Sequence, residues 1–380
     1  MNIRLQQRNL YSMEENKKKI DLFLAALSPY IETNTVNGDE KKINGKDFIV
    51  WGDNNAYPQF LWQCYLECAT LQTIINSVVD YVVGDAVESN VEKFKIAVNK
   101  DGDTIIDIVK KIATDYVIFG SFALQIIRNR IGEVQEIYWI DINKLRSDEK
   151  NEVFFYSDDW NKSYGRVKYI TYPKYKYEDT NIATSIFYYK GHTTRSVYGI
   201  PMWSAAVKNV QIDREITNFH LNEINNNFMS SKLISFNNGQ PDDDLKVEIE
   251  KNLNDKFTGT GNAGRILISF SESKENAPEV LDLGSDDFDV RYSDLEKRNK
   301  EQLFISFRCT PLLVGMVSES NGFATQEYRD SYKLFNKTTV RPIQNAIVDV
   351  FDKIIGVKGS ISITPFSIDF EEDNKDKNVE

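Results

Sequence analysis

The sequence predicts an α+β protein built from more than one structural unit. Its 380 residues exceed one average domain, and 41% of them are hydrophobic, including 22 Phe and 19 Tyr. This is enough apolar material for separate cores and for contacts between subunits. Segments with apolar residues at helical spacing alternate with short runs of β-forming residues, and this mixture predicts the α+β class.

Two strong helix signals follow a polar start. Residues 1–48 are rich in Glu, Lys and Asn, and we expect them to form an arm. Apolar residues recur at helical spacing over 57–83, which predicts one or two core helices ending at Gly84. A second such segment, 104–118, is expected to end at Gly120, because glycine is the usual residue after a helix.

The spacing of apolar residues changes after the second helix. FALQIIRN (122–129) and EVQEIYWIDI (133–142) predict a pair of strands that turns at Gly132. Further strands are expected in VFFYS, GRVKYITY and SIFYYK. Residues 85–197 are therefore expected to form an α+β unit.

Two long helices flank a small insertion in the second half of the chain. The first is expected from Pro201 to about Asn227 and has a long polar face, and the second, over 286–307, is densely charged. Between them lie the strand SKLISF, a helix over 245–256 and the strand RILISF. The insertion thus has the order β-α-β.

Proline and glycine divide the segment that follows the charged helix. Pro311 ends that helix, and LLVGMVSESNG has the composition of a loop, although its start is apolar. A helix over 325–355 is expected to be interrupted at Pro342, which lacks a backbone donor. The tail predicts one short strand and an acidic end.

The charge balance argues against a protein that holds nucleic acid tightly. The formal net charge is −11. Affinity for nucleic acid comes mostly from Lys and Arg that neutralise phosphates, so we expect any DNA contact to be loose. An acidic balance is equally typical of a soluble enzyme, and charge alone does not separate these classes.

The cysteines and histidines do not predict a metal or cofactor site. Cys64, Cys68 and Cys309 are expected to be buried free thiols in a reducing compartment. A zinc site needs further ligands, and His192 and His220 lack the spacing of such ligands. The polar start is not a secretory signal, and no run approaches the ~18 apolar residues that a membrane span needs.

Motifs that suggest chemistry have simpler explanations. Residues 259–264 read G-x-G-x-x-G, but a helix precedes them and a strand follows, which reverses the order of a dinucleotide site. Acidic clusters at 242–244 and 286–287 stand at helix starts, where Asp caps exposed N–H groups. The chain has no Walker motif, and neither histidine lies near a nucleophile elbow. We expect no enzymatic activity.

The order of elements resembles the portal proteins of tailed bacteriophages. The resemblance rests on five segments over about 230 residues, none of them specific alone. They are the strand pair from Gly120 to Arg128 with Gly132, then YWIDINKLR, then YYKGHTTRSVYGIPMWSAAVKNV with its Tyr-Gly-x-Pro, then NNNFMSSKLISF, FTGTGNAGRILISF and LDLG, and finally DVRYSDLEKRNKEQLFISFRCTPLLVG. The sequence departs from the family in its short C-terminal region and in Cys309-Thr310-Pro311, where a Val-Pro-Pro-like stretch is common.

The resemblance implies a ring subunit with an α/β wing, two stem helices and a small β-α-β clip. The implied divisions are an arm and wing (1–200), a stem helix (201–228), a clip (229–285), a second stem helix (286–308), a tunnel loop (309–324), and wing helices with a short tail and a reduced or absent crown (325–380). The tunnel loop implies DNA-channel residues Leu312, Leu313, Ser318, Glu319, Ser320 and Asn321. The clip implies docking residues Asp242, Asp243, Asp244, Glu272 and Glu275.

The resemblance also implies partners and a location. The implied assembly is a homo-oligomeric ring of about twelve subunits. The implied partners are the major capsid protein, the large terminase subunit, tail adaptor proteins and double-stranded DNA that passes loosely through the channel. The implied location is a virion assembled in the host cytoplasm, and neither a cofactor nor a membrane is expected. Two alternatives remain open from the residues alone: a soluble nucleic-acid-processing phage enzyme with an unrecognised active site, and another virion subunit such as an adaptor. The mass of the native assembly separates a ring from an enzyme.

Overall fold

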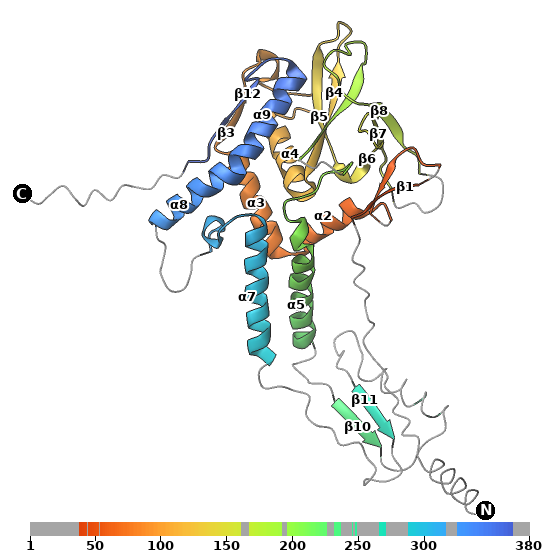
Figure 1. The fold of residues 1–380 in the computed structure, drawn as a ribbon, viewed down its shortest axis with the longest axis vertical. Coiled ribbons are helices and arrows are strands. Elements are labelled where there is room, and N and C mark those ends of the chain that lie inside the picture. The colour runs from red at the N-terminus through yellow and green to blue at the C-terminus, as the bar shows by residue number, and fades with distance from the viewer. Residues whose placement is uncertain are drawn as a thin grey trace, which may run out of the picture. The chain divides into compact units, whose positions relative to one another are not determined.

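The structure is a computed structural model that describes residues 38–43, 45–52, 54–160, 167–191, 196–225, 232–236, 266–270, 288–316 and 325–367, together with Leu245 and Glu248. The chain divides into two units. The described residues within 216–293 belong to a smaller unit, and those within 34–215 and 294–380 to the main unit. The boundary passes through two helices, α5 (Val207–Asn225) and α7 (Phe288–Ser306) (Figure 1).

Three helices form the first part of the core of the main unit. α2 (Tyr57–Glu67) and α3 (Ala69–Val83) meet at Cys68, whose extended backbone ends the first helix while its sulfur accepts a hydrogen bond from Leu71 N–H of the second. α4 (Ile105–Phe119) begins with a capping box between Thr104 and Asp107 and ends at Gly120. The two helical segments predicted from apolar spacing are therefore confirmed, the first as two helices.

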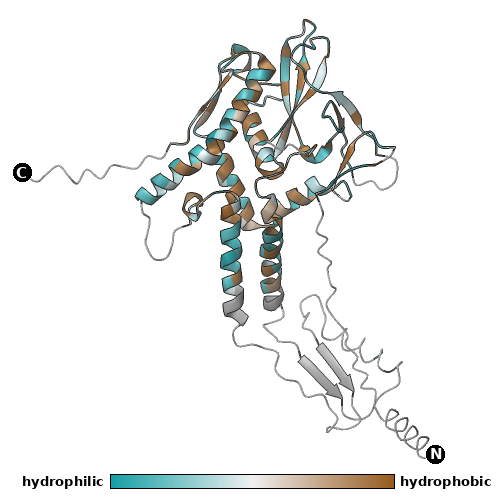
Figure 2. Ribbon diagram, in the orientation of Figure 1, coloured by the Kyte–Doolittle hydropathy of each residue, from teal (hydrophilic) through white to brown (hydrophobic). Residues whose placement is uncertain are grey.

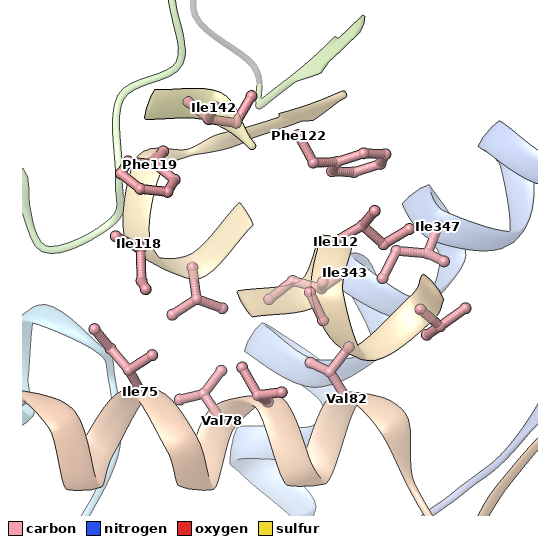
Figure 3. Close-up of a cluster of buried hydrophobic side chains, with 14 of the residues drawn as sticks. Ile75, Val78, Val82, Ile112, Ile118, Phe119, Phe122, Ile142, Ile343 and Ile347 are labelled. Carbon is pink, nitrogen blue, oxygen red and sulfur yellow. The ribbon is translucent and has the colours of Figure 1, made fainter. Parts of the chain in front are cut away.

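The C-terminal helices cover α3. α8 (Thr325–Phe335) continues through a π-helical turn, η6 (Asn336–Val340), into α9 (Arg341–Ile355). The backbone stays helical across this boundary, and Pro342 lies directly after the π-helical turn, so the predicted interruption is a local change of helical hydrogen bonding and not a break. In Figure 3, residues of α3 face α4 on one side and Ile343 and Ile347 of α9 on another.

The predicted strand pair is the centre of a three-stranded antiparallel sheet. Its order is β5 (Val134–Ile140), β4 (Ser121–Arg128), β9 (Thr184–Lys190). A second antiparallel sheet contains β6 (Leu145–Ser147), β7 (Val153–Tyr156) and β8 (Ile170–Pro173). The strands predicted in VFFYS, GRVKYITY and SIFYYK are thus present, and β4, buried along most of its length, joins the sheet to the core.

Two further strand pairs join distant segments. β1 (Glu40–Lys42) pairs with β2 (Ile49–Trp51), so the expectation that residues up to 48 form only a polar arm is wrong for its described end. The physical reason is that the Glu40 carboxylate accepts hydrogen bonds from the N–H groups of Val197 and Tyr198, which fixes this segment to the main unit. β3 (Ala86–Ser89) pairs antiparallel with β12 (Ile361–Thr364), the strand predicted in the tail.

In the smaller unit the described strands β10 (Lys232–Phe236) and β11 (Ile266–Phe270) pair in parallel. These are the strands predicted in SKLISF and RILISF. Parallel neighbours need a crossover connection, which agrees with the predicted β-α-β order; of the helix predicted over 245–256 the structure describes Leu245 and Glu248, both helical. Among the helices that the structure describes, none is both long enough and apolar enough to cross a membrane.

Candidate functional site

The candidate site is the helix junction, defined here as the main-unit ends of α5 and α7 together with the segment Cys309–Met316. Chain order places this junction where the main unit is interrupted by the smaller one. Trp203, just before the 3-10 turn η3 (Ser204–Ala206) that leads into α5, is fully buried and donates its indole N–H to Val117 O at 3.1 Å. At the other side, Leu303 of α7 and Phe307, the residue that follows this helix, are fully buried. Apolar anchors thus hold both helices at their main-unit ends.

Polar contacts connect the two helices at the junction. Asn299 is 2% exposed, and its amide N–H₂ donates to Asn209 O at 2.8 Å. The amide group of Asn209 donates in turn to Asn299 Oδ1 at 2.9 Å. This reciprocal pair satisfies buried polar groups with specific partners, so it fixes the register of one helix against the other.

One turn further along, α5 is tied to the corner between α2 and α3. The Cys68 thiol donates to Asp213 Oδ2 at 3.2 Å, and Arg214 contacts Glu67 at 2.8 Å. Burial raises the pKa of Cys68 to about 12, so this sulfur stays protonated and acts as a donor. Cys64, Cys68 and Cys309 are buried free thiols, as predicted.

The Tyr-Gly-x-Pro motif lies immediately before the junction and is explained by close packing. Tyr198 stacks on Trp51 with ring centroids 4.2 Å apart and an angle of 3° between the rings, and its hydroxyl accepts from Ser147 N–H at 3.1 Å. A Cβ at Gly199 would lie 2.5 Å from the carbonyl carbon of Gly120. The motif therefore brings the start of α5 against the end of α4, at a distance that no side chain allows.

Arg146, the last residue of YWIDINKLR, supports the same region from within the core. It is fully buried between Trp51 and Trp160, and its guanidinium donates to Asn55 Oδ1 at 2.6 Å and Asn55 O at 2.5 Å. Burial lowers its pKa to about 10, so it keeps its charge at neutral pH. Because its donors are used mainly by carbonyl oxygens of the protein, this buried cation has a structural role and holds neighbouring segments together.

The segment after α7 is more ordered than its loop composition predicts. Residues Pro311–Val314 form a 3-10 turn, η5, which starts after Arg308 with φ +53° and ends at Gly315 with φ +83°. Leu313 is 4% exposed and its carbonyl accepts from the Tyr81 hydroxyl at 2.8 Å. Tyr81 also exchanges a hydrogen bond with Tyr328 of α8 at 2.8 Å. The expectation of an irregular loop is therefore wrong for this part.

The predicted channel residues divide accordingly. Leu313 packs into the core of its own subunit because the 3-10 turn points it toward α3, so it offers no free side chain to a channel or to a neighbour. Leu312 is half-buried. Ser318, Glu319, Ser320 and Asn321 lie outside the described residues, as do the predicted docking residues Asp242, Asp243, Asp244, Glu272 and Glu275.

Other residues singled out in the sequence add no chemistry to the described site. His220 is exposed on α5, and His192 and the glycines of 259–264 lie outside the described residues. In the part of the chain that the structure describes, no three metal-ligating side chains come together. What the junction does is position two helices by packing and hydrogen bonding.

Sequence reasoning missed the residues that make this connection. Neither Asn209 nor Asn299 is singled out by the sequence analysis, yet Asn299 lies four and eight residues before the buried Leu303 and Phe307. That spacing places it on the apolar face of α7 and was the available signal. Asp213 carries no such signal, because its partner Cys68 is 145 residues away in the chain.

The fold is an α+β main unit that is interrupted by a smaller unit, with two helices anchored at the junction. Such a fold defines a class of protein and does not by itself define an activity. A family model described as phage portal protein matches residues 94–374. The chain belongs to this family, as its resemblance predicted, and the family is a structural one.

Two solved structures with TM-scores above 0.5 support the fold. The neck of a native gene transfer agent (GTA) particle, computed with C12 symmetry, is 13% identical, with 81% of this chain and 83% of that chain covered and a TM-score of 0.53. The virion of a native GTA particle matches over the same shares at 13% identity and a TM-score of 0.52. A HK97 family phage portal protein from Corynebacterium diphtheriae is 11% identical over 77% and 88% of the two chains, with a TM-score of 0.49. No curated protein matches the chain.

Proposed function

We propose that this chain is the subunit of a portal ring, the channel at a capsid vertex through which a viral genome is packaged and ejected. The observation that carries the proposal is the family match over residues 94–374. The fold similarity to a neck described with C12 symmetry supports a ring of twelve copies. The ring is part of the virion, assembled in the host cytoplasm, and contacts the major capsid protein.

We assign the regions of the chain by the same reasoning. Residues 1–200 and 325–380 form the wing, 201–228 and 286–308 the stem, 229–285 the clip and 309–324 the tunnel loop. The helix junction supports this division, because α5 and α7 leave a well-packed unit through specific contacts. Figure 2 shows that the described part of α7 is largely hydrophilic, as a solvated or channel-facing helix requires.

The charge of α7 suits a channel that does not grip DNA. Its exposed residues include Lys297 and Arg298, with Glu301 one turn later. The helix has as many acidic as basic residues, and Lys300 is paired with Glu296 at 2.6 Å. Each unpaired cation facing a bore would add a phosphate contact that slows sliding, so this balance limits such contacts. The proposed bore residues Ser318, Glu319, Ser320 and Asn321 add no cation either.

The clip carries the proposed docking contacts. Asp242, Asp243, Asp244, Glu272 and Glu275 would present an acidic surface first to the large terminase subunit and later to the tail adaptor. Acidic docking surfaces steer partners with basic patches and lose effect as salt rises.

The mass of the purified chain under native conditions tests the proposal. We expect a closed assembly of twelve subunits, seen as rings by electron microscopy and at one vertex of particles. A chain that remains monomeric at high concentration, and that is absent from particle vertices, would exclude the portal function.

A further inference from the structure

A pocket of about 340 Å³ in the main unit is used by none of the portal roles above. Its lining includes Trp62 of α2, Lys111, Asp115 and Phe119 of α4, Trp139 of β5, and Asn143 of the 3-10 turn η2 (Ile142–Lys144). The pocket thus combines aromatic rings with a buried acidic side chain.

Asp115 is an acid without a cation. It is 4% exposed, and its Oδ2 accepts one hydrogen bond, from the Trp139 indole N–H at 2.7 Å. Within the described residues its other oxygen has no hydrogen-bond partner. The nearest lysine along the helix, Lys111, is paired with Asp103 at 2.9 Å instead. A buried carboxyl group in this state lacks the compensation that buried charges normally have.

The donors in the pocket walls are directed elsewhere: Lys111 is paired with Asp103, the Thr114 hydroxyl donates to Lys110 O at 2.9 Å, and Lys110 is exposed. The acceptors are not matched in this way. Asn143 donates its amide to Asp141 Oδ1 at 2.9 Å, which fixes the orientation of the side chain, and its buried Oδ1 has no donor. Trp62 is 37% exposed, and Trp139 is half-buried. A carboxyl group between indole rings matches a guanidinium group, which carries five donors and stacks on aromatic faces.

The rim of the pocket favours a protein ligand. Leu66, one turn after Trp62 on α2, is 56% exposed, and together the two side chains form an apolar edge beside the acidic interior. A free cation would leave this edge in water, whereas a neighbouring protein surface would cover it. In a ring of identical subunits each copy presents two different faces to its neighbours. A cationic side chain on one face can therefore reach the unpaired Asp115 on the facing side of the next copy.

We propose that this pocket binds the guanidinium group of an arginine from a second copy of the chain. The proposal rests on the ring assembly proposed above and identifies one of its contacts. The arginine donates to the free oxygen of Asp115 and stacks between Trp62 and Trp139, while Leu66 packs against the neighbouring surface.

The contact makes assembly sensitive to pH. Burial raises the pKa of Asp115 well above 3.8; the hydrogen bond from Trp139 opposes this shift and the nearby Asp141 adds to it, so the free subunit favours the protonated form. An arriving guanidinium favours the ionised form, so docking releases a proton. Assembly therefore strengthens as pH rises toward the raised pKa. The other charged groups of the lining are Lys110 and Lys111 on α4 and Asp141, the N-cap of η2.

The variant Asp115→Asn tests the proposal, with Asp101→Asn, which removes an exposed acid, as the matched control. By sedimentation, rings of Asp115→Asn should dissociate at a concentration at least about tenfold higher than wild-type rings, the lower end of the coupling measured for close charge pairs across interfaces. The control should assemble normally. Thermal unfolding should show that Asp115→Asn is folded, since the amide still accepts from Trp139. The pH dependence of assembly should also be weaker in this variant.

A second measurement does not depend on the stability of that variant. A photoreactive phenylalanine analogue in place of Trp62 should cross-link wild-type rings into covalent dimers, and the captured peptide should contain an arginine of the same chain. Rings of Asp115→Asn as stable as wild type, or intact rings without cross-linked dimers, overturn this contact and leave the portal proposal standing. A wild-type chain that forms no ring overturns both.

Discussion

The core around α3 and the helix junction are built on different principles. Where α3 meets α4 and α9, the contacts are made by Ile and Val side chains that are fully buried or nearly so (Figure 3). At the junction, the contact between α5 and α7 is made by the amide groups of Asn209 and Asn299. The first interface is stabilised by the apolar area that it removes from water, and the second by the directional geometry of its hydrogen bonds.

The two regions therefore contribute different properties: the core contributes folding stability, and the junction determines the relative position of α5 and α7. Apolar burial is large but tolerates small shifts between helices, whereas a reciprocal amide pair contributes little and permits one register. The core should therefore determine whether the subunit folds, and the junction should determine where two helices leave it. A ring subunit needs both properties, because identical copies must present identical surfaces.

The largest expected effect is in the core. Ile112→Ala removes a fully buried side chain of α4 and leaves a cavity against α3 and α9, so we expect a loss of about 2–5 kcal/mol in the free energy of unfolding. Ile96→Ala is the matched control, since Ile96 is 87% exposed, and it should change this free energy by less than about 0.5 kcal/mol. Chemical denaturation measures both. Equal effects would contradict the description of the core.

A smaller effect is expected at the entrance to the junction. Gly199→Ala places a methyl group 2.5 Å from Gly120 backbone atoms, which must move, at a cost of about 1–3 kcal/mol. Gly315→Ala meets no atom within 4 Å and has only the strain of φ +83°, about 1 kcal/mol. Thermal unfolding of the two variants compares steric contact with backbone conformation. If Gly315→Ala lowers the melting temperature more than Gly199→Ala does, the segment before α5 does not pack closely against the end of α4.

The smallest effect in unfolding energy is expected for the amide pair. In a double-mutant cycle of Asn209→Ala and Asn299→Ala, we expect a coupling energy of about 0.5–1.5 kcal/mol. Assembly should respond more strongly than folding, because the double variant no longer fixes the register of α7 against α5. Denaturation gives the first quantity and the yield of closed rings the second. If the effects of the two single variants on the free energy of unfolding are additive, Asn209 and Asn299 do not interact energetically at the junction.

Much of this fold was predictable because its signals are local. The glycines expected to end the helices do so at Gly84 and Gly120, and the strand pair around Gly132 follows from alternation within a short segment. The short strands β1 and β3 were not predictable in this way. Each pairs over three or four residues, and β3 finds its partner in β12 at the other end of the main unit.

The candidate sites were less predictable than the fold, for the same reason. The resemblance implies a channel position for Leu313, whereas its side chain is buried in the 3-10 turn η5 and its carbonyl accepts from the distant Tyr81. Asp115 looked like one more polar position on a helix, and its burial depends on Trp139 from a strand. Local patterns say which element forms, whereas burial depends on what packs against it.

The position of α9 in the chain has a consequence for synthesis. Gln344 of α9 donates to Val82 O of α3 at 3.0 Å, across 262 residues of sequence, and β12 follows α9 to pair with β3. On the ribosome, α4 can cover its part of α3 early, but the part that α9 covers stays exposed until residues 341–364 have emerged, after the whole smaller unit has been made. A chain cut short before that point cannot close its core. In the ring proposed above, incomplete chains would therefore lack the folded main unit that assembly requires.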